Sequence, residues 1–209
     1  MIFIPSIEGG GVEKNLFIIS NYLSEKIPNI YISTASHNMK KKFSKKISFI
    51  LPDSKKWEGK GRFVKTIICL WKLFLFWKDN RDIAIFSFQG NIYSIFFAYL
   101  LNIKIISRSN SAPEGWSKNI FKKFIFSLFL KRADNIIVNS LDFKKSLYKN
   151  FKVDSVCIYN PLDKKRINSL SKKKINFKWF EKNKIKIINV GRFTDQKDHM
   201  TLLKAINYS

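Results

Sequence analysis

The chain of 209 residues is long enough for one ordinary domain and part of another, and too short for two complete α/β domains. Hydrophobic residues make up 45% of the sequence and aromatic residues 15%, which excludes a wholly disordered protein. The balance of 39 Lys and Arg against 15 Asp and Glu gives a net charge of +24. This charge favours contact with the phosphates of nucleic acid, lipid or nucleotide, but it also fits a solvated basic surface.

The cysteine usage and the hydropathy bear on the cellular compartment of the protein. Cys69 and Cys157 lie in apolar segments, which is typical of buried thiols in a reducing environment. Glycines follow the first residues too early for a signal peptide, and lysines interrupt each apolar run before it reaches the length that spans a bilayer. We therefore expect a cytoplasmic protein, with the cytoplasmic face of the membrane as a further location.

Short β-branched runs alternate with longer segments of helical periodicity, an order that predicts a parallel sheet covered by helices. The predicted strands are 2–4, 30–34, 47–51, 83–87, 104–107, 135–139 and 156–159. The predicted helices are 12–26, 62–78, 92–101, 119–132 and 141–150. Ser140 is expected to cap the last helix, because a serine hydroxyl can accept a hydrogen bond from the free amides of a first helical turn.

The character of the sequence changes after Asn160-Pro161, so residues 1–162 form the first predicted domain. Residues 163–183 are basic and irregular, which predicts a connecting segment or a short helix. Residues 184–190 predict a strand, and residues 198–207 predict a helix. One strand and one helix cannot bury their apolar faces alone, so residues 184–209 are expected to be the opening of a second domain that is cut short.

Two loops have the features of phosphate sites. Gly9 to Gly11 stand between a strand and a helix, where backbone amides can approach an anion closely. Arg192 and Lys197 flank a turn after a strand, where an arginine fork and a mobile lysine suit a diphosphate. An empty tight turn and a solvated basic turn are the respective alternatives. A nicotinamide cofactor is disfavoured, because the G-x-G-x-x-G spacing and an acidic residue after the second strand are both missing from the sequence.

Four segments resemble the retaining nucleotide-sugar glycosyltransferases of the large family four, which have the GT-B fold of two Rossmann-like domains. GGGVEK is similar to the family's Gly-Gly-x-Glu-Arg/Lys opening, and VGRFTDQKDHMTLLKA to its Val-Gly-Arg-x-x-x-Gln-Lys signature. ADNIIVNSLDFKKSL resembles the strand and serine-capped helix late in the first domain, and IYNPLD resembles the turn that leads into the second. These ordered matches cover nearly the whole chain.

The resemblance implies an α/β fold, with a Rossmann-like parallel sheet and helices on both of its faces. It implies that Gly10 and Gly11 face the reacting sugar, and that Arg192 and Lys197 bind the donor's diphosphate, where cations stabilise the charge of the leaving group. The implied reaction transfers a sugar to an acceptor hydroxyl with retention, in polysaccharide or glycolipid assembly. The resemblance implies that the first domain, 1–162, holds the acceptor and that the second, of which 184–209 is the opening, binds the donor. The nucleotide-sugar is a substrate, and neither a cofactor nor a metal is expected.

The sequence departs from the family in two places. Many relatives carry a histidine after the strand that corresponds to KIISRSNSAP, whereas Arg108 and Asn110 here resemble a Ser-x-Arg-Asn loop of polysaccharide-assembly members. These two side chains are expected to contribute to catalysis by facing donor or acceptor, with a structural cap as the alternative. The paired-glutamate motif and nucleoside pocket of the second domain are missing from the sequence, so weak or no activity is expected of this chain by itself.

The partners follow from these features. The helical segments TIICLWKLFLFWK and NIFKKFIFSLFLKR interleave aromatic residues and lysines, which fits either packing on a sheet or docking on an anionic membrane surface. The expected partners are a nucleotide-sugar donor and a glycan or lipid-linked acceptor, without a specific nucleic acid, since no base-stacking motif occurs. The alternative function is a truncated, non-catalytic basic module that binds anionic membrane or nucleic acid.

Overall fold

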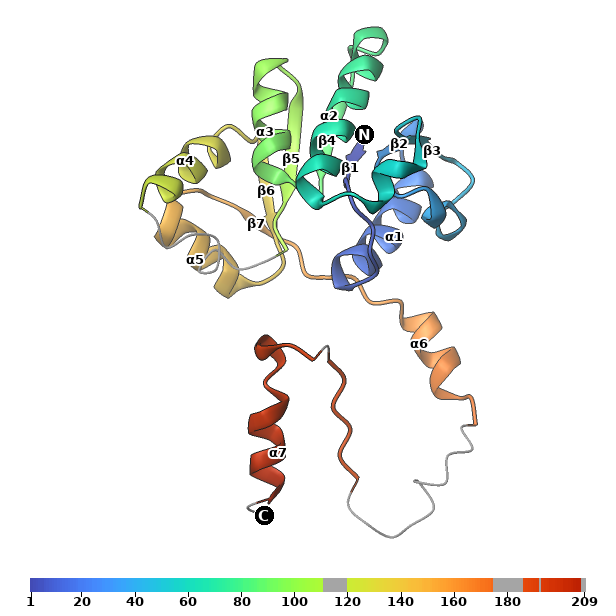
Figure 1. Ribbon diagram of the computed structural model, residues 1–209, viewed down its shortest axis with the longest axis vertical. Coiled ribbons are helices and arrows are strands. Elements are labelled where there is room, and N and C mark those ends of the chain that lie inside the picture. The colour runs from blue at the N-terminus through green and yellow to red at the C-terminus, as the bar shows by residue number, and fades with distance from the viewer. Residues whose placement is uncertain (111–119, 175–185, 192, 208–209) are drawn as a thin grey trace. The chain divides into compact units, whose positions relative to one another are not determined.

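The computed structural model describes residues 1–110, 120–174, 186–191 and 193–207. The chain divides into two compact units, Met1–Asp163 and Lys164–Ser209, and each is described by itself. The first unit is a parallel sheet of seven strands with helices around it (Figure 1). The predicted α/β class and Rossmann-like sheet are confirmed for this unit.

The strands follow the order β3-β2-β1-β4-β5-β6-β7, and all neighbouring pairs are parallel. Their bounds are β1 Ile2–Phe3, β2 Ile30–Ser33, β3 Ile47–Ile50, β4 Ala84–Ser87, β5 Lys104–Arg108, β6 Asn135–Val138 and β7 Val156–Cys157. Each strand lies where the β-branched runs predicted one. The chain therefore begins in the middle of the sheet and builds first toward one edge and then toward the other.

The helices of the first unit also match the predicted segments, with ends shifted by one or two residues. They are α1 Gly11–Ser24, α2 Arg62–Asp79, α3 Asn91–Leu100, α4 Ile120–Leu130 and α5 Leu141–Phe151. Ser140 caps α5 as predicted, because its hydroxyl accepts a hydrogen bond from the Phe143 amide at 3.1 Å. The short 3-10 helices η1 His37–Lys42 and η2 Lys55–Gly59 have no counterpart among the predicted elements.

The two faces of the sheet carry separate cores. Successive residues of a strand point to opposite faces, so Ile2 and Ile4 pack with Leu16 of α1, whereas Phe3 packs with Leu73 of α2. The connection through α1 runs toward the β3 edge, and the connections through α2 to α5 run toward the β7 edge. Right-handed crossovers therefore place α1 on one face and α2 to α5 on the other.

The two cysteines differ in burial. Cys69 of α2 is fully buried in the core beneath the helices, as predicted, and burial raises the pKa of its thiol to about 12. Cys157 ends the edge strand β7 and is only half-buried.

The second unit contains α6 Lys164–Ser171, η5 Asp195–Lys197 and α7 His199–Asn207. α6 agrees with the short helix that was one of the two predictions for residues 163–183. α7 is the helix predicted at 198–207. The prediction of a strand at 184–190 is wrong for residues 186–190, which are not part of a strand. A strand needs a neighbour to receive its backbone hydrogen bonds, and the described part of this unit supplies none. The division of the chain at 162, 163–183 and 184–209 stays a prediction.

Candidate functional site

Hydrogen bonds join the loops at the carboxyl ends of four strands, the edge at which parallel α/β sheets bind ligands. After β1, the Ser6 amide donates to Gln89 Oε1, at 3.3 Å, in the loop after β4. Asn91, at the start of α3, donates from its side-chain amide to the Arg108 carbonyl at the end of β5, at 3.0 Å. Arg108 in turn reaches Asn160, beyond β7. One edge of the sheet thus gathers polar side chains from distant parts of the first unit.

Arg108 is the central residue of this edge. It ends β5 and is 1% exposed, and its Nη2 donates to Asn160 Oδ1 at 2.9 Å. Its Nε has no hydrogen-bond partner in the part of the chain that the structure describes. Burial lowers the pKa of the guanidinium, yet an arginine keeps its charge at neutral pH. A buried charge that is incompletely paired is costly, so an oxygen-rich or anionic ligand would satisfy it.

The neighbours of Arg108 add three further unsatisfied atoms. Ser107 Oγ, Ser109 Oγ and Asn110 Oδ1 are buried without a hydrogen-bond partner among the described residues. The amide nitrogen of Asn110 donates to the Phe88 carbonyl at 3.0 Å, so this side chain also fastens the β4 loop. Buried polar atoms without partners are rare in folded proteins. Successive residues of a strand point to opposite faces, so Ser107 and Arg108 at the end of β5 do not face the same ligand. The catalytic role predicted for Arg108 and Asn110 stays a prediction.

The glycine loop is shaped by Glu13 as well as by its backbone. Gly9 has φ +86°, and a Cβ on Gly10 would stand 3.0 Å from Glu13 Oε2. Glu13 is buried, and its other oxygen accepts a hydrogen bond from the Glu8 amide at 3.4 Å. A carboxylate therefore lies at the start of α1, where the loop pattern alone suggested room for an anion. A Cβ on Gly11 would meet nothing within 4 Å. The sugar-facing role of Gly10 and Gly11 stays a prediction.

A buried lysine supports this loop, and no sequence pattern distinguishes it from the many other basic residues. Lys65 of α2 is 6% exposed, and its Nζ donates to Ser6 Oγ at 3.1 Å. Ser6 Oγ donates to Glu8 Oε1 at 2.7 Å, and Arg62 Nη2 donates to Glu8 Oε2 at 2.8 Å. The hydrogen bond from Arg62 is the main reason why the pKa of Glu8 falls to about 2. This network fixes the loop after β1 against the first turns of α2.

The predicted diphosphate site lies in the second unit. Arg192 falls outside the described residues. Lys197 ends η5, and its side chain packs over Gly191, where a Cβ would stand 3.3 Å from Lys197 Cγ. A glycine at 191 therefore leaves room for the Lys197 stem. Lys197 itself is exposed, and its role toward a donor stays a prediction.

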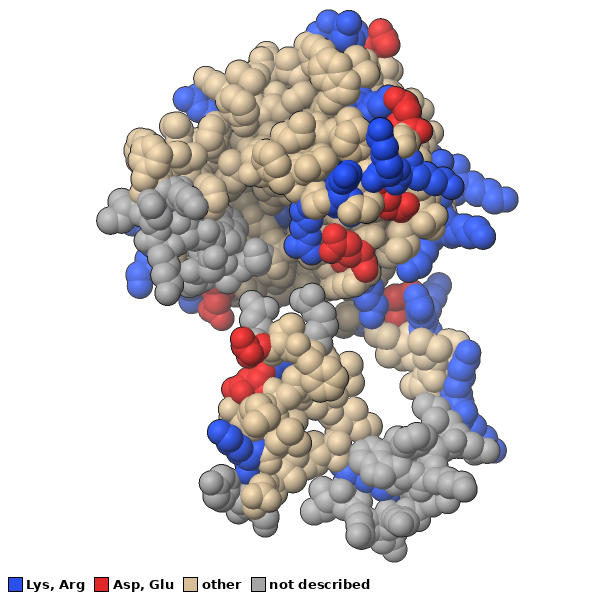
Figure 2. Space-filling model, in the orientation of Figure 1, with Lys and Arg blue, Asp and Glu red and all other residues tan. Residues whose placement is uncertain are grey.

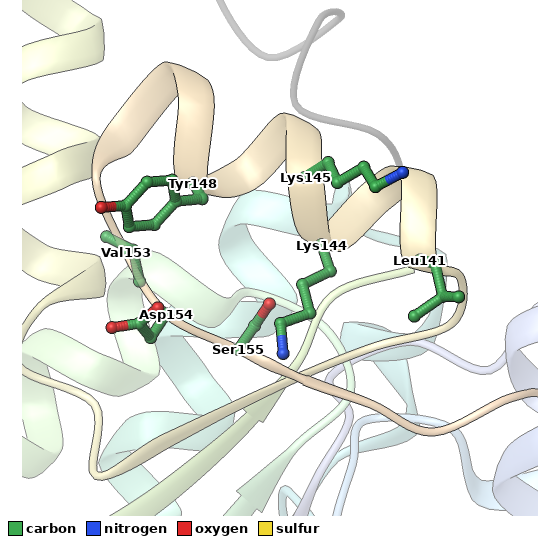
Figure 3. Close-up of a pocket in the computed structure, with 7 residues that line it drawn as sticks. All are labelled: Leu141, Lys144, Lys145, Tyr148, Val153, Asp154 and Ser155. Carbon is green, nitrogen blue, oxygen red and sulfur yellow. The ribbon is translucent and has the colours of Figure 1, made fainter.

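A pocket of about 380 Å³ lies elsewhere in the first unit, between α5 and the segment that leads into β7. Its lining side chains are Leu141, Lys144, Lys145, Tyr148, Val153, Asp154 and Ser155 (Figure 3). The sequence did not indicate this pocket, and the pocket includes none of the predicted site residues.

The described residues contain no group of three His, Cys, Asp or Glu side chains that could hold a metal ion. Within the same ranges, no helix is both long and apolar enough to cross a membrane.

Comparisons with known proteins extend the evidence on fold. No protein-family model and no curated protein matches the sequence. Among solved structures, the chain is similar to Anabaena Alr3699/HepE in complex with UDP and glucose, with a TM-score of 0.55, 12% identity and 78% of this chain covered. It is also similar to Glycyrrhiza uralensis UGT73P12 complexed with glycyrrhetinic acid 3-O-monoglucuronide, with a TM-score of 0.48, 10% identity and coverage of 75% of this chain and 48% of that one.

The likeness to HepE concerns the fold alone, because so few residues are identical. The chain spans 44% of the HepE chain, less than half of its length. The likeness therefore supports a Rossmann-like α/β fold for this chain.

Proposed function

We propose that the chain is part of a glycosyltransferase that moves a sugar from a nucleotide-sugar to a hydroxyl of a glycan or lipid-linked acceptor, with retention of configuration. The observation that carries the proposal is the buried guanidinium of Arg108 at the carboxyl end of β5, whose Nε has no hydrogen-bond partner among the described residues. The sequence motifs and the fold shared with HepE, a structure solved with UDP and glucose, support it. The reaction would serve polysaccharide or glycolipid assembly in the cytoplasm, at the membrane face when the acceptor is a lipid.

The proposed chemistry assigns each predicted residue a task. The bond between the anomeric carbon and a diphosphate oxygen breaks, and the acceptor oxygen bonds to the same carbon on the same side. The proton of the acceptor hydroxyl passes to the leaving diphosphate. Negative charge gathers on the leaving diphosphate, where Arg192 and Lys197 stabilise it. Arg108 and Asn110 offer a buried positive charge and hydrogen-bonding groups to the donor or acceptor, and the backbone at Gly10 and Gly11 faces the sugar. Neither a metal nor an organic cofactor takes part in this proposal.

A transfer assay tests this proposal. The chain is incubated with UDP-, GDP- and ADP-sugars and with glycan and lipid-linked acceptors, and the glycosylated product is detected by mass. We expect equimolar release of nucleoside diphosphate, at a rate that Arg108→Met lowers at least about tenfold by removing the buried charge. Arg166→Met, at an exposed arginine of α6, is the control and should leave the rate unchanged. Equal rates for the Arg108→Met variant and the control variant would count against the proposal.

The alternative is a non-catalytic basic module, which the net charge of +24 favours. Such a module would bind DNA or anionic vesicles with an affinity that falls steeply with salt and ignores added sugars. Specific binding of one nucleotide-sugar would argue against it.

A further inference from the structure

Three neighbouring helices of the first unit expose large apolar side chains on their outer surface. Trp71 of α2 is 55% exposed, Tyr99 of α3 is 51% exposed and Phe124 of α4 is 66% exposed. We call the whole set the aromatic face. It consists of Phe63, Ile67, Trp71 and Leu75 of α2, Tyr93, Phe96, Tyr99 and Leu100 of α3, and Phe124 and Leu128 of α4.

The inner sides of the same helices are already occupied by the sheet. Cys69 and Leu73 of α2, with Ile95 and Ala98 of α3, are fully buried in the core. The sheet therefore accounts for one side of each helix and leaves the apolar outer side unexplained. A helix that is apolar on both sides normally has a second apolar neighbour.

The aromatic face is continuous across the helices. Phe63 of α2 and Tyr93 of α3 meet with ring centroids 5.6 Å apart, and Phe96 of α3 meets Phe129 of α4 at 5.3 Å. Figure 2 shows a broad area without charged side chains over this part of the first unit, with Lys and Arg at its margin. A contiguous apolar area of this kind on a folded protein marks an interaction surface, whereas scattered apolar residues do not.

The helices that carry the aromatic face contain more basic than acidic residues. The sequences of the three helices contain a single acidic residue, Asp79, at the last position of α2. Exposed basic residues follow the ends of α2 and α4. The Arg81 guanidinium lies 3.7 Å from the ring centroid of Trp77, and that of Arg132 lies 4.6 Å from the ring centroid of Tyr99. Arginine side chains that lie over Trp and Tyr rings suit the headgroup region of a lipid bilayer. There the rings contact hydrocarbon and the guanidinium groups contact phosphate.

We propose that the aromatic face binds the surface of an anionic lipid bilayer. A second copy of this chain is a poorer occupant, because each copy carries a charge of +24 and the two would repel each other. The helices of the described residues are not suited to crossing the membrane, so the contact is peripheral. Binding of this kind does not depend on the transfer reaction, and either proposal can fail while the other holds.

The position of the aromatic face also bears on the candidate site. Phe63 and Tyr93 lie in the first turns of α2 and α3, beside the loops at the carboxyl ends of the strands. Docking through this face would hold that edge of the sheet next to the lipid surface. An acceptor carried by a membrane lipid would then have a short path to Arg108.

Sedimentation with vesicles tests the proposal on the full chain. Vesicles of phosphatidylcholine with phosphatidylglycerol are compared with vesicles of phosphatidylcholine alone. We expect partition into the anionic vesicles, weakened by salt and lowered about tenfold or more in the double variant Trp71→Ser/Phe124→Ser. Tyr22→Ser is the matched control, because Tyr22 is 63% exposed on α1, on the other face of the sheet. Its partition should stay within about twofold of the unaltered chain.

A second measurement tests the same contact without the double variant, in case that variant does not fold. Acyl chains brominated near the headgroup should quench the fluorescence of Trp71, and the milder variant Trp71→Phe should remove that part of the quenching. Equal partition of the Trp71→Ser/Phe124→Ser and Tyr22→Ser variants would overturn the proposal, as would unchanged quenching in Trp71→Phe. A lipid-free dimer that Trp71→Ser/Phe124→Ser abolishes would assign the face to a second copy instead.

Discussion

The ion pair between Glu8 and Arg62 joins the loop after β1 to the first turn of α2. The hydrogen bond from Arg62 is the largest cause that lowers the pKa of Glu8 from 4.5 to about 2, followed by the one from Ser6. The folded-state pKa lies below the unfolded one, so the pair stabilises the fold above about pH 4.5. This stabilisation is lost as the pH falls toward 2 and Glu8 takes up a proton.

Glu8→Gln tests this dependence. At pH 7 we expect the free energy of unfolding to fall by about 1 kcal/mol at most, because both side chains are substantially exposed and water screens the pair. Urea unfolding at a series of pH values should show the gap between Glu8→Gln and the unaltered chain closing below about pH 4.5. Glu25→Gln, which breaks the exposed pair with Lys46 on another part of the surface, is the comparison. A gap for Glu8→Gln that is constant down to pH 2 would contradict the assignment.

Arg108 shows what the sequence reveals of a site and what it leaves open. The resemblance of the KIISRSNSAP segment to a Ser-x-Arg-Asn loop of the family singled out Arg108 and Asn110. The bond from Arg108 to Asn160 joins residues 52 positions apart, so only the fold could reveal it. Lys65 had no signal at all, since its burial depends on the packing of α2 against the loop that holds Ser6.

At the scale of elements, Gly90 is a point where backbone geometry dictates the residue. It precedes α3 with φ +66°, and an added Cβ would lie 3.2 Å from Thr66 Cγ2 and 3.5 Å from Phe3 Cε1. The left-handed backbone and the two contacts both oppose a side chain. The turn between β4 and α3, next to the candidate site, therefore requires glycine.

Gly90→Ala is expected to lower the free energy of unfolding by about 1–2 kcal/mol. Gly59→Ala is the matched control, because a Cβ there meets nothing within 4 Å, and its effect should stay below about 0.5 kcal/mol. Urea or thermal unfolding of both variants measures the difference. Equal stability of the two variants would show that the turn tolerates a side chain at position 90.

The elements that sequence could predict are those with their own periodic pattern. Each strand of the sheet and the helices α1 to α5 carry enough apolar residues at the right spacing to fix their type. The 3-10 helices η1 and η2 have no such period, and they were missed. Residues 186–190 have a strand-like pattern, but a strand also needs a partner, which a local pattern does not provide.

At the scale of the whole molecule, the arrangement of layers decided what the sequence had left undecided. For the aromatic helices, the sequence allowed packing on the sheet or docking on a membrane. Cys69 and Leu73 show that α2 packs on the sheet, and Trp71 shows that its outer side is exposed as well. Packing on the sheet is therefore confirmed for the inner side of α2, and membrane docking of its outer side stays a proposal. No pattern along the chain could separate them, because both sides are apolar.

The central claim is the proposal that Arg108 and Lys197 help this chain to bind a nucleotide-sugar. Saturation-transfer NMR with UDP-, GDP- and ADP-sugars, added in turn to the full chain, measures such binding directly and detects weak ligands. We predict that at least one compound receives saturation on both its nucleoside and its sugar protons. Arg108→Met and Lys197→Ala should each remove most of that signal, and Arg166→Met should keep it. No transfer to any compound, or equal transfer with Arg108→Met and Arg166→Met, would contradict the claim.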